Sequence, residues 1–461
     1  MKNIHAKTLG LLIPLSLLAG APALAAVPGA PCPVVESAFP IMCWTYYPFG
    51  KVLDWNYTVD NWVRLGVNRP LTPGVDGKTD KVRFRAFLDK CLTAGLHVYV
   101  SDGRCGPGGV NAFVRTGDEA AYRAACRQAR TDWADHPAVL GFYLFDEPDA
   151  RQSTNVFRAA KIMAEEIPGK QPFLNLLPWY AWVGKRMGAD ALRPYLERCV
   201  RESGLSYLGY DYYSQQNARY AEPFDGWFEN LREWTTFSRE TGTRWNVSVL
   251  CSEHFDYIAH TDIDFRWQIS TAVAMGAHGL TWFYPDHHGD GHANYRNAPI
   301  NQLGERTPTF DAMGFENRIF QHQFGAQFAA LRFERATMSG KAYGGVPLFT
   351  KDTDPDVREV RASGKDPSPV LVSFFSDPND AKGTRYVALV NLRHETEGSR
   401  HVRLVLSDNV MPFQKTWDGW NLLSVSHDAG LANTTGETGA TQSLGIYLAP
   451  GQLALLRLRR K

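Results

Sequence analysis

Eight short apolar runs, separated by longer amphipathic segments, occupy residues 38 to 290 of this chain. Runs that are apolar at nearly every position are typical of strands buried on both faces in a parallel sheet. Between them, segments such as 81–95 place apolar residues mostly on one helical face and end in a glycine, which favours a helix terminus. Eight strand–helix repeats in about 250 residues predict a (β/α)8 barrel. The runs cover residues 38–47, 66–71, 95–102, 139–147, 171–178, 205–213, 244–253 and 278–286.

An open, doubly wound sheet is the alternative interpretation of these repeats. The phosphate-binding pattern G-x-G-x-x-G is absent after the first run, which disfavours it. After about residue 335 the helical periodicity fades, and short alternating runs are separated by Asp-Pro, Gly-Thr and Pro-Gly turns. This pattern predicts an all-β region, most simply an antiparallel β-sandwich. We therefore expect a signal peptide at 1–25, a barrel at 26–334 and a sandwich at 335–461.

The first 25 residues have the pattern of an export signal. Two lysines accompany the apolar stretch 9–18, and the small-residue sequence Ala-Leu-Ala follows at 23–25. The stretch is too short for a good membrane span. We expect an exported protein, periplasmic or secreted, with no membrane association after cleavage; an uncleaved anchor is the alternative.

The composition disfavours nucleic acid and membranes as partners and is compatible with carbohydrate. The 461 residues carry a formal net charge of +1, so no bulk electrostatic field favours nucleic acid or an anionic membrane. Aromatic residues make up 12% of the chain, with 13 Trp, which suits a packed core or a sugar-binding cleft equally. None of the seven cysteines has the paired spacing of a metal site, and the odd count leaves at least one thiol unpaired. We expect no cofactor and no metal.

Polar residues at the ends of the predicted strands indicate the active site, because barrel enzymes place it at the carboxyl-terminal edge. Two of these residues are glutamates that follow the fourth and seventh strands, Glu147 and Glu253. Two carboxyl groups across a cleft suit glycoside hydrolysis, in which one protonates the leaving oxygen and the other attacks the sugar or activates water. The other polar or aromatic strand ends are Asn68-Arg69, Asp102 and Arg104, Asp146, Asp211 with Tyr212 and Tyr213, and Trp282 with Tyr284, Asp286 and His287.

The pattern resembles the clan A glycoside hydrolases, retaining (β/α)8 enzymes with an acid/base Glu after strand four and a nucleophile Glu after strand seven. The segment "HPAVLGFYLFDEP" is similar to their strand-four segment, and "RWQISTAVAMGAHGLTWFY" resembles the helix-seven to strand-eight segment of the beta-galactosidase-like members. The resemblance covers about residues 38 to 300 and implies Glu147 as acid/base and Glu253 as nucleophile. It also implies Arg69 and Tyr212, or Tyr210, as residues that hold the nucleophile. Trp282, or Tyr284 if the register slips, would form an aromatic floor.

One position departs from the clan pattern. The clan places Asn before the acid/base Glu, and here that residue is Asp146. The Asp-Glu pair also resembles the N-acetylhexosaminidases, in which the Asp orients a substrate acetamide that acts as the nucleophile. In that interpretation Glu253 is not the nucleophile. A non-catalytic carbohydrate-binding barrel is the alternative from another class, although a decayed site usually loses one of its two glutamates.

Other segments give weaker signals. The segment 286–295 gathers three His and two Asp on one loop, so we interpret it as a substrate-contacting loop more readily than as a metal site. No G-x-S-x-G elbow for a serine nucleophile occurs. Trp44 and Trp179 follow the first and fifth runs and are candidates for sugar subsites, whereas Trp62 lies in a helical pattern and is expected in the core. The sequence thus predicts an exported glycoside hydrolase whose substrate is an oligo- or polysaccharide, with Glu147→Gln and Glu253→Gln each abolishing most turnover.

Overall fold

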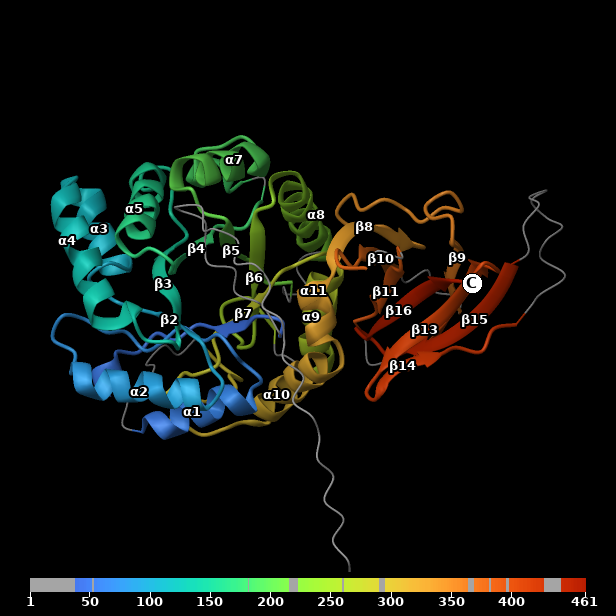
Figure 1. Ribbon diagram of the computed structural model, residues 1–461, viewed down its shortest axis with the longest axis horizontal. Coiled ribbons are helices and arrows are strands. Elements are labelled where there is room, and N and C mark those ends of the chain that lie inside the picture. Colours follow the sequence, from blue (N-terminus) through green and yellow to red (C-terminus); the bar gives the residue numbers. More distant parts are fainter. Residues whose placement is uncertain are drawn as a thin grey trace, which may run out of the picture.

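The computed structural model contains one parallel sheet and two antiparallel sheets (Figure 1). It describes residues 38–51, 54–180, 182–214, 223–258, 261–289, 295–363, 369–380, 383–394, 398–426 and 441–461. The predicted signal peptide and Cys32 lie outside these residues. The parallel sheet has the order β1-β7-β6-β5-β4-β3-β2. Its strands are β1 (Ile41–Cys43), β2 (Val98–Val100), β3 (Val139–Asp146), β4 (Gln171–Leu176), β5 (Tyr207–Asp211), β6 (Arg244–Leu250) and β7 (Leu280–Phe283).

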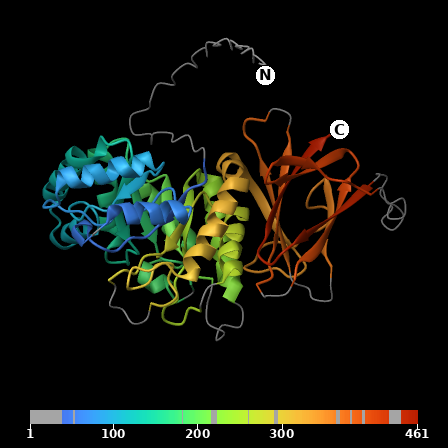
Figure 2. The same ribbon diagram turned by 90° about the horizontal axis from the view of Figure 1, so that it is seen from below.

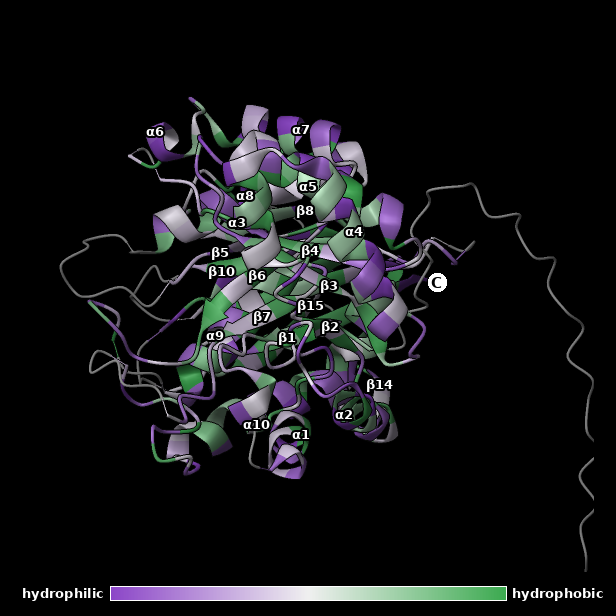
Figure 3. Cartoon of the chain, turned by 90° about the vertical axis from the view of Figure 1, so that its left-hand side faces the viewer, coloured by the Kyte–Doolittle hydropathy of each residue, from purple (hydrophilic) through white to green (hydrophobic). Residues whose placement is uncertain are grey.

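Helices follow the strands and cover the outside of the curled sheet, as the alternating pattern predicts. Figure 3 shows hydrophobic residues concentrated on the central strands and hydrophilic residues on the surrounding helices. The helices are α1 (Trp55–Arg64), α2 (Lys81–Thr93), α3 (Pro107–Thr116), α4 (Glu119–Ala129), α5 (Ser153–Glu166), α6 (Gly184–Met187), α7 (Leu192–Ser203), α8 (Pro223–Thr241), α9 (Asp262–Ala274), α10 (Pro308–Phe320) and α11 (Ala326–Ala330), with shorter helical turns at Phe49–Lys51, Arg130–Ala134 and Gln321–Gly325.

The predicted second strand, 66–71, is not a regular strand. It nevertheless lies between β1 and β2, because Leu71 N donates to Cys43 O (3.1 Å) and Thr72 N donates to Tyr99 O (2.9 Å). Pro70 lacks an N–H group and therefore cannot donate in a sheet ladder. The segment 68–75 closes the barrel in an irregular conformation, so the eight-fold arrangement holds with seven regular strands.

Two separate apolar clusters form on the two faces of the parallel sheet. The larger one packs between the sheet and the helices. The smaller one fills the inside of the barrel with Met42, Trp44, Leu71, Tyr99, Tyr143, Phe173, Tyr207 and Tyr284. Large aromatic side chains therefore fill the barrel interior.

The C-terminal region is a β-sandwich, as the alternating runs predict. One sheet has the order β14-β13-β16-β11-β10-β8 and the other has the order β15-β12-β9. A third apolar cluster, rich in Val and Leu, lies between them. The first strand, β8, spans the predicted division at residue 335. The strands are β8 (Arg332–Ser339), β9 (Val357–Ala362), β10 (Val370–Ser376), β11 (Arg385–Asn391), β12 (Arg400–Ser407), β13 (Val410–Thr416), β14 (Gly419–Leu422), β15 (Thr441–Leu448) and β16 (Leu453–Arg460).

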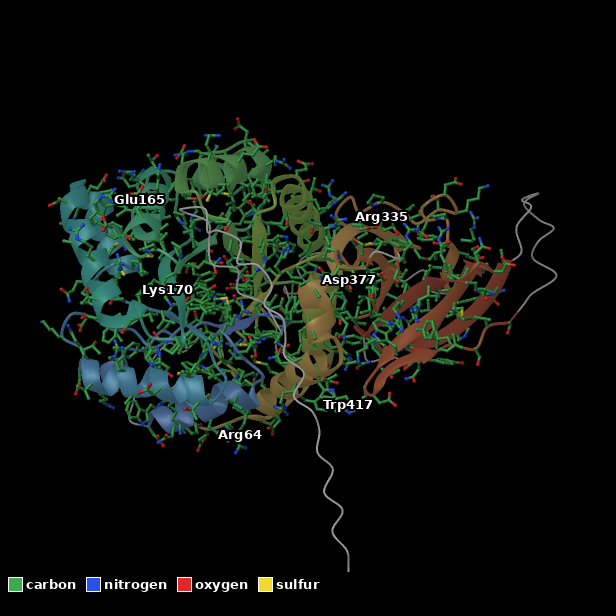
Figure 4. All side chains as sticks on the ribbon, in the orientation of Figure 1. Arg64, Glu165, Lys170, Arg335, Asp377 and Trp417 are labelled. Carbon is green, nitrogen blue, oxygen red and sulfur yellow. The ribbon has the colours of Figure 1, made fainter. Side chains whose placement is uncertain are left out.

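Helices α9 and α10 lie between the parallel sheet and the sandwich (Figures 1 and 2). Trp267 on α9 is fully buried, and its Nε1 donates to Leu392 O (3.3 Å) beyond the end of β11. The Trp417 ring, labelled in Figure 4 at the lower edge of the sandwich, stacks on His322 with a centroid distance of 3.8 Å. The sandwich is therefore docked on the side of the barrel, and none of these contacts reaches the strand ends at the barrel mouth.

Candidate active site

A cavity of about 1240 Å3, which we call the main cavity, opens at the carboxyl-terminal ends of the parallel strands. Side chains that follow β1, β3, β4, β5, β6 and β7 contribute to its wall, so it lies where a barrel of this kind places its site. Its wall contains an unusual number of carboxyl groups and aromatic rings. They are Asp54, Asp146, Glu147, Asp211 and Asp286, with Trp44, Tyr46, Tyr47, Tyr57, Tyr213, Phe255, Phe283, Tyr284 and Tyr295.

The two consecutive carboxyl groups after β3 both line this cavity, although side chains alternate along a strand. Two backbone irregularities account for this. The pairing of β3 with β4 shifts register between Tyr143 and Phe145, and such a bulge redirects the side chains that follow it. Glu147 then adopts a left-handed conformation with φ of 43°, which is uncommon for a non-glycine residue. Its N–H donates to Asn175 O (2.9 Å), so this conformation is anchored to β4.

Asn175, at the end of β4, connects the carboxyl groups on either side of it. Its Nδ2 donates to Asp146 Oδ1 (2.9 Å) and to Asp211 Oδ1 (3.1 Å). A glycine on the neighbouring strand makes room for this amide. A Cβ on Gly209 would lie 3.1 Å from Asn175 Oδ1 and 2.7 Å from Asn246 Oδ1. Any larger residue at position 209 would therefore displace Asn246 and press against Asn175.

The buried carboxyl groups bind protons more tightly than isolated ones. Burial raises the pKa of Asp146 to about 7, and the charge of Glu147 adds to the effect. Burial also holds the pKa of Asp211 well above its usual range, together with the charges of Glu147 and Asp146 and a hydrogen bond to the Glu147 carboxyl. On its other side, Glu147 Oε2 accepts a bond from Arg186 Nη2 on α6 (3.1 Å). The cluster of Asp146, Glu147 and Asp211 can therefore store a proton near neutral pH.

Aromatic rings border this carboxyl cluster. Trp44 is fixed by a bond from its Nε1 to Ser248 Oγ (3.2 Å), and the Tyr46 ring lies parallel to it at 5.7 Å. Tyr213, directly after the β5 segment, packs against the rings of His254 and Phe283. Burial raises the pKa of the Tyr213 phenol and the charges of Asp211 and Asp146 add to the effect, so the phenol stays a hydrogen-bond donor. Apolar faces beside polar edges are the surface that a sugar ring requires.

Asp286, which follows β7, lines the main cavity beyond this cluster. Its Oδ2 accepts a bond from the Tyr47 hydroxyl (3.2 Å), and its Oδ1 accepts one from the His288 N–H (3.0 Å). Burial raises its pKa. In the order of strands around the barrel, β7 and β3 are far apart, so Asp286 and Glu147 enter the cavity from different sides.

The structure does not bring Glu253 into the wall of the main cavity. Its Oε1 binds Arg296 Nη2 (2.8 Å), and its Oε2 accepts a bond from Asn297 Nδ2 (2.6 Å). The main chain is bound as well, since Glu253 N donates to Arg296 O (2.8 Å) and Arg296 N donates to Glu253 O (2.8 Å). The next residue, His254, lines the cavity instead. Both oxygens of the predicted nucleophile are therefore engaged by a neighbouring loop.

Arg69 lies at the opposite end of the barrel from the position that the resemblance implies. Its N–H donates to Ile41 O (3.0 Å), at the first residue of β1. Burial lowers the pKa of His97, which directly precedes β2, and the charge of Arg69 adds to this effect. Because parallel strands begin at the same edge, Arg69 lies near the amino-terminal edge and does not reach the carboxyl cluster. The segment 68–75 reaches the mouth only near Gly74 and Val75.

Three of the predicted aromatic residues lie outside the wall of the main cavity. Trp282 is fully buried, and its Nε1 donates to Asn317 Oδ1 on α10 (3.1 Å), so it points outward, and Phe283 and Tyr284 line the cavity. Tyr212 packs outward against Trp227 on α8, and Tyr213 lines the cavity. The third aromatic, Trp179, is half-buried outside the wall. Of the predicted residues, Asp146, Glu147, Asp211, Trp44 and Tyr284 do line the main cavity.

Other polar strand ends serve the fold. Asp102 is fully buried and binds Arg104 Nη2 (2.6 Å) and Trp133 Nε1 (2.8 Å). Within the described residues no group of three or more His, Cys, Asp or Glu is gathered as a metal site, and residues 290–294 of the histidine-rich loop lie outside them. The six described cysteines are buried thiols. No helix of the described chain has the length and apolarity that a membrane crossing requires.

Several residues of the candidate site were not predicted from the sequence. Asn175 lies inside the fifth apolar run, and its polar side chain there was the available signal. Phe283 lies between the predicted Trp282 and Tyr284, and Tyr46 lies two residues after the predicted Trp44. His254 directly follows the predicted Glu253. Arg186, on a four-residue helix, had no local signal.

Comparison with known proteins gives a fold but no close relative. No family model and no curated protein matches the chain. A GH42 beta-galactosidase from G. stearothermophilus matches with a TM-score of 0.57 at 7% identity, covering 92% of this chain and 99% of that one. A structure described as a glycoside hydrolase has a TM-score of 0.53 at 10% identity, covering 92% and 93%. A cold-adapted beta-galactosidase from Rahnella sp. R3 has a TM-score of 0.50 at 9% identity, covering 93% and 100%.

These likenesses are too distant in sequence to show more than the fold. The chain shares the barrel-and-sandwich architecture of these glycoside hydrolases over nearly its whole length. The chain spans only 60% of the length of a beta-galactosidase from the psychrophilic Marinomonas ef1.

Proposed function

We propose that this chain is a glycoside hydrolase that cleaves O-glycosidic bonds of an oligo- or polysaccharide, with Glu147 as the proton donor. The observation that carries the proposal is the carboxyl cluster at the base of the main cavity, in which Asp211 hydrogen-bonds Glu147 and shares Asn175 with Asp146. General acid catalysis needs a carboxyl group with a proton at neutral pH, next to surfaces that hold a sugar. The cluster and its aromatic border supply both.

Proton transfer follows from the hydrogen bonds of the cluster. Asp211 holds a proton that it shares with the Glu147 carboxyl, and Arg186 binds the other oxygen of Glu147. When a glycosidic oxygen enters the cavity, Glu147 donates a proton to it as the bond to the anomeric carbon breaks. The pair has then lost its shared proton, and the water that completes hydrolysis gives its hydroxyl group to the anomeric carbon and its proton to Glu147.

The second chemical role has two candidates. In the first, Glu253 is the nucleophile of a covalent glycosyl-enzyme, which requires it to leave Arg296 and Asn297. In the second, Asp146 orients a 2-acetamido group of the substrate, whose carbonyl oxygen attacks the anomeric carbon. The engagement of both Glu253 oxygens favours the second candidate, as does the placement of Asp146 beside the proton donor.

One experiment tests the activity and separates the two candidates. The enzyme is assayed on a panel of 4-nitrophenyl glycosides of both anomers, with and without a 2-acetamido group, and Glu147→Gln serves as the inactive control. Hydrolysis confined to 2-acetamido glycosides, with inhibition by the matching thiazoline, supports substrate assistance. A peptide containing Glu253 that gains the mass of a 2-deoxy-2-fluoro sugar supports the covalent route. Equal activity of wild type and Glu147→Gln on every substrate contradicts the role of Glu147.

Export is a further part of the proposal. The charged, apolar and small-residue segments of residues 1–25 support cleavage after residue 25, which gives a periplasmic or secreted enzyme. The mass of the protein from the periplasmic or culture fraction tests this. A mass that retains residues 1–25 contradicts it.

A further inference from the structure

A second cavity of about 660 Å3, which we call the side cavity, adjoins the main cavity. Both cavities share part of their wall, the segment from Tyr46 to Gly50, so this segment forms a ridge between them. Two backbone bonds fix the ridge, since Phe49 N donates to Gly74 O (2.7 Å) and Gly74 N donates to Tyr47 O (3.0 Å). Beyond the ridge, the wall of the side cavity includes Asp76, Lys78, Thr79, Asp80, Arg83 and Ser101.

The side cavity begins next to the proposed catalytic carboxyl groups. Tyr143 is part of its wall, and the charges of Asp146 and Glu147 add to burial in raising the pKa of the Tyr143 phenol. Tyr143 also packs edge-on against Trp44, in the wall of the main cavity, at 5.3 Å. A chain that leaves the carboxyl cluster across the ridge therefore enters the side cavity directly.

The ridge carries an aromatic ring with an accessible surface. Tyr46 stacks on Trp44 at an angle of 4° and meets the Tyr284 ring edge-on at 5.0 Å, so its position is fixed. Even so, 49% of its surface is exposed. A fixed, half-exposed ring in a cleft presents an apolar face of the kind that packs on the C–H face of a sugar.

The wall of the side cavity is polar and electrically balanced. Asp76 and Asp80 contribute two negative charges, and Lys78 and Arg83 contribute two positive charges. Thr79 and Ser101 add hydroxyl groups. Alternating donors and acceptors without net charge match the hydroxyl groups of a neutral sugar better than a carboxylate or sulfate group.

We propose that the side cavity is a distal subsite for a neutral saccharide chain, and that Tyr46 is the platform over which the chain passes from the main cavity. Binding pockets of about 300–1,000 Å3 hold an average small-molecule ligand. The main cavity exceeds this range and the side cavity lies within it, so together they have room for several sugar units. The inference rests on the proposed function and adds to it that the enzyme prefers a chain over a single sugar.

The test compares substrates of increasing length. Once the glycoside panel has identified a hydrolysed sugar, kcat/KM is measured for its 4-nitrophenyl monoglycoside and for its oligosaccharides of increasing length. We expect kcat/KM to rise by about tenfold or more as the chain fills the side cavity, a factor that corresponds to about 1.4 kcal/mol. A kcat/KM that does not change with length overturns the inference while leaving the hydrolase activity in place. A protein that neither hydrolyses nor binds any glycoside contradicts the proposed function itself.

Variants of Ser101 locate the effect, because this residue belongs to the wall of the side cavity and not to that of the main cavity. Ser101→Phe fills the space, so we expect it to remove the gain with chain length and to leave the monoglycoside kcat/KM within about twofold. Ser101→Ala is the matched control and keeps the gain. If Ser101→Phe retains the gain, the side cavity is not a subsite. If Ser101→Phe fails to fold, the exposed Lys78→Ala decides: a several-fold loss confined to the long substrates supports the subsite, and no loss on them overturns it.

Discussion

Glu147 and Glu253 follow two buried strands of the same barrel, and only one of them lines the main cavity. The difference lies in the backbone rather than in the side chains. On β6, Asn246 contacts the Tyr207 hydroxyl and Ser248 contacts Trp44, so even-numbered residues face inward and His254 continues that series. Glu253 is odd-numbered, so its side chain belongs to the series that faces away from the barrel interior. On β3, the bulge and the left-handed Glu147 break the alternation and turn two consecutive carboxyl groups inward.

The largest effect in this comparison is expected from Glu147→Gln. The amide keeps the shape of the side chain but cannot donate an acidic proton, so kcat on the best glycoside should fall by about 10²- to 10⁴-fold. Steady-state kinetics measures the loss, and an unchanged thermal midpoint shows that folding is intact. A decrease of less than about threefold would exclude Glu147 as the proton donor.

Asp211→Asn is expected to be the next most damaging change. The variant keeps a bond to Asn175 or Glu147 but cannot hold the proton that Asp211 shares with Glu147, so we expect kcat to fall by about 10- to 100-fold, less than the loss of the donor itself. The matched control is Asp54→Asn, in the same cavity wall but with its carboxylate capping α1 through Asn56 N. Equal losses in the two variants would argue that Asp211 acts only through the charge of the cavity.

Glu253→Gln should have a small effect, in contrast to the prediction from the clan resemblance. Glutamine can still accept from Arg296 or Asn297, and a half-exposed ion pair of this type contributes about 0–1 kcal/mol. We expect kcat to change by less than about threefold, since Glu253 lies outside the cavity wall. A loss of about 10³-fold or more, with an intact fold, would restore Glu253 as the nucleophile and remove the contrast between the two strands.

The smallest expected effect is a change in the pH dependence of stability in Asp146→Asn. The pKa of Asp146 is raised from its ordinary value of 3.8 to about 7 in the folded chain. The folded state therefore keeps a proton that the unfolded state loses, and stability falls as pH rises from about 4 to about 7. Asparagine removes this loss. The thermal midpoint of the variant should increase relative to wild type as the pH is raised from 4 to 7, and a constant difference across that range would contradict the buried, neutral carboxyl.

The sequence predicted the fold well because the burial pattern of each strand and helix is written in neighbouring residues of the chain. The apolar runs correspond to strands that are buried on both faces, and the amphipathic segments correspond to helices that are buried on one face. Both patterns appear in the structure. The one predicted strand that is not regular, 66–71, contains Pro70 and two polar residues, and only tertiary closure places it between β1 and β2.

The candidate site was predicted less evenly, because side-chain direction depends on features that a sequence does not display. Trp282, Phe283 and Tyr284 are three consecutive aromatics, so composition cannot show which of them faces inward. Nothing in the sequence marks the bulge in β3. Residue 147 has a left-handed backbone conformation but is not the glycine that usually marks one. Asp146 and Glu147 were located by the abrupt end of an apolar run, whereas the pairing of Glu253 with Arg296 depends on a contact 43 residues away in the chain.

The irregular closure of the barrel has a consequence for its motions. The segment 68–75 joins β1 and β2 without a regular ladder, and Gly74 in the same segment anchors the ridge between the two cavities. Regions with few ladder bonds open at lower free energy than continuous strands. We therefore expect the amide hydrogens of the segment 68–75 to exchange with solvent faster than those of β5 and β6. Each opening of the segment 68–75 also releases the ridge. The main and side cavities therefore widen transiently when this least regular part of the barrel opens.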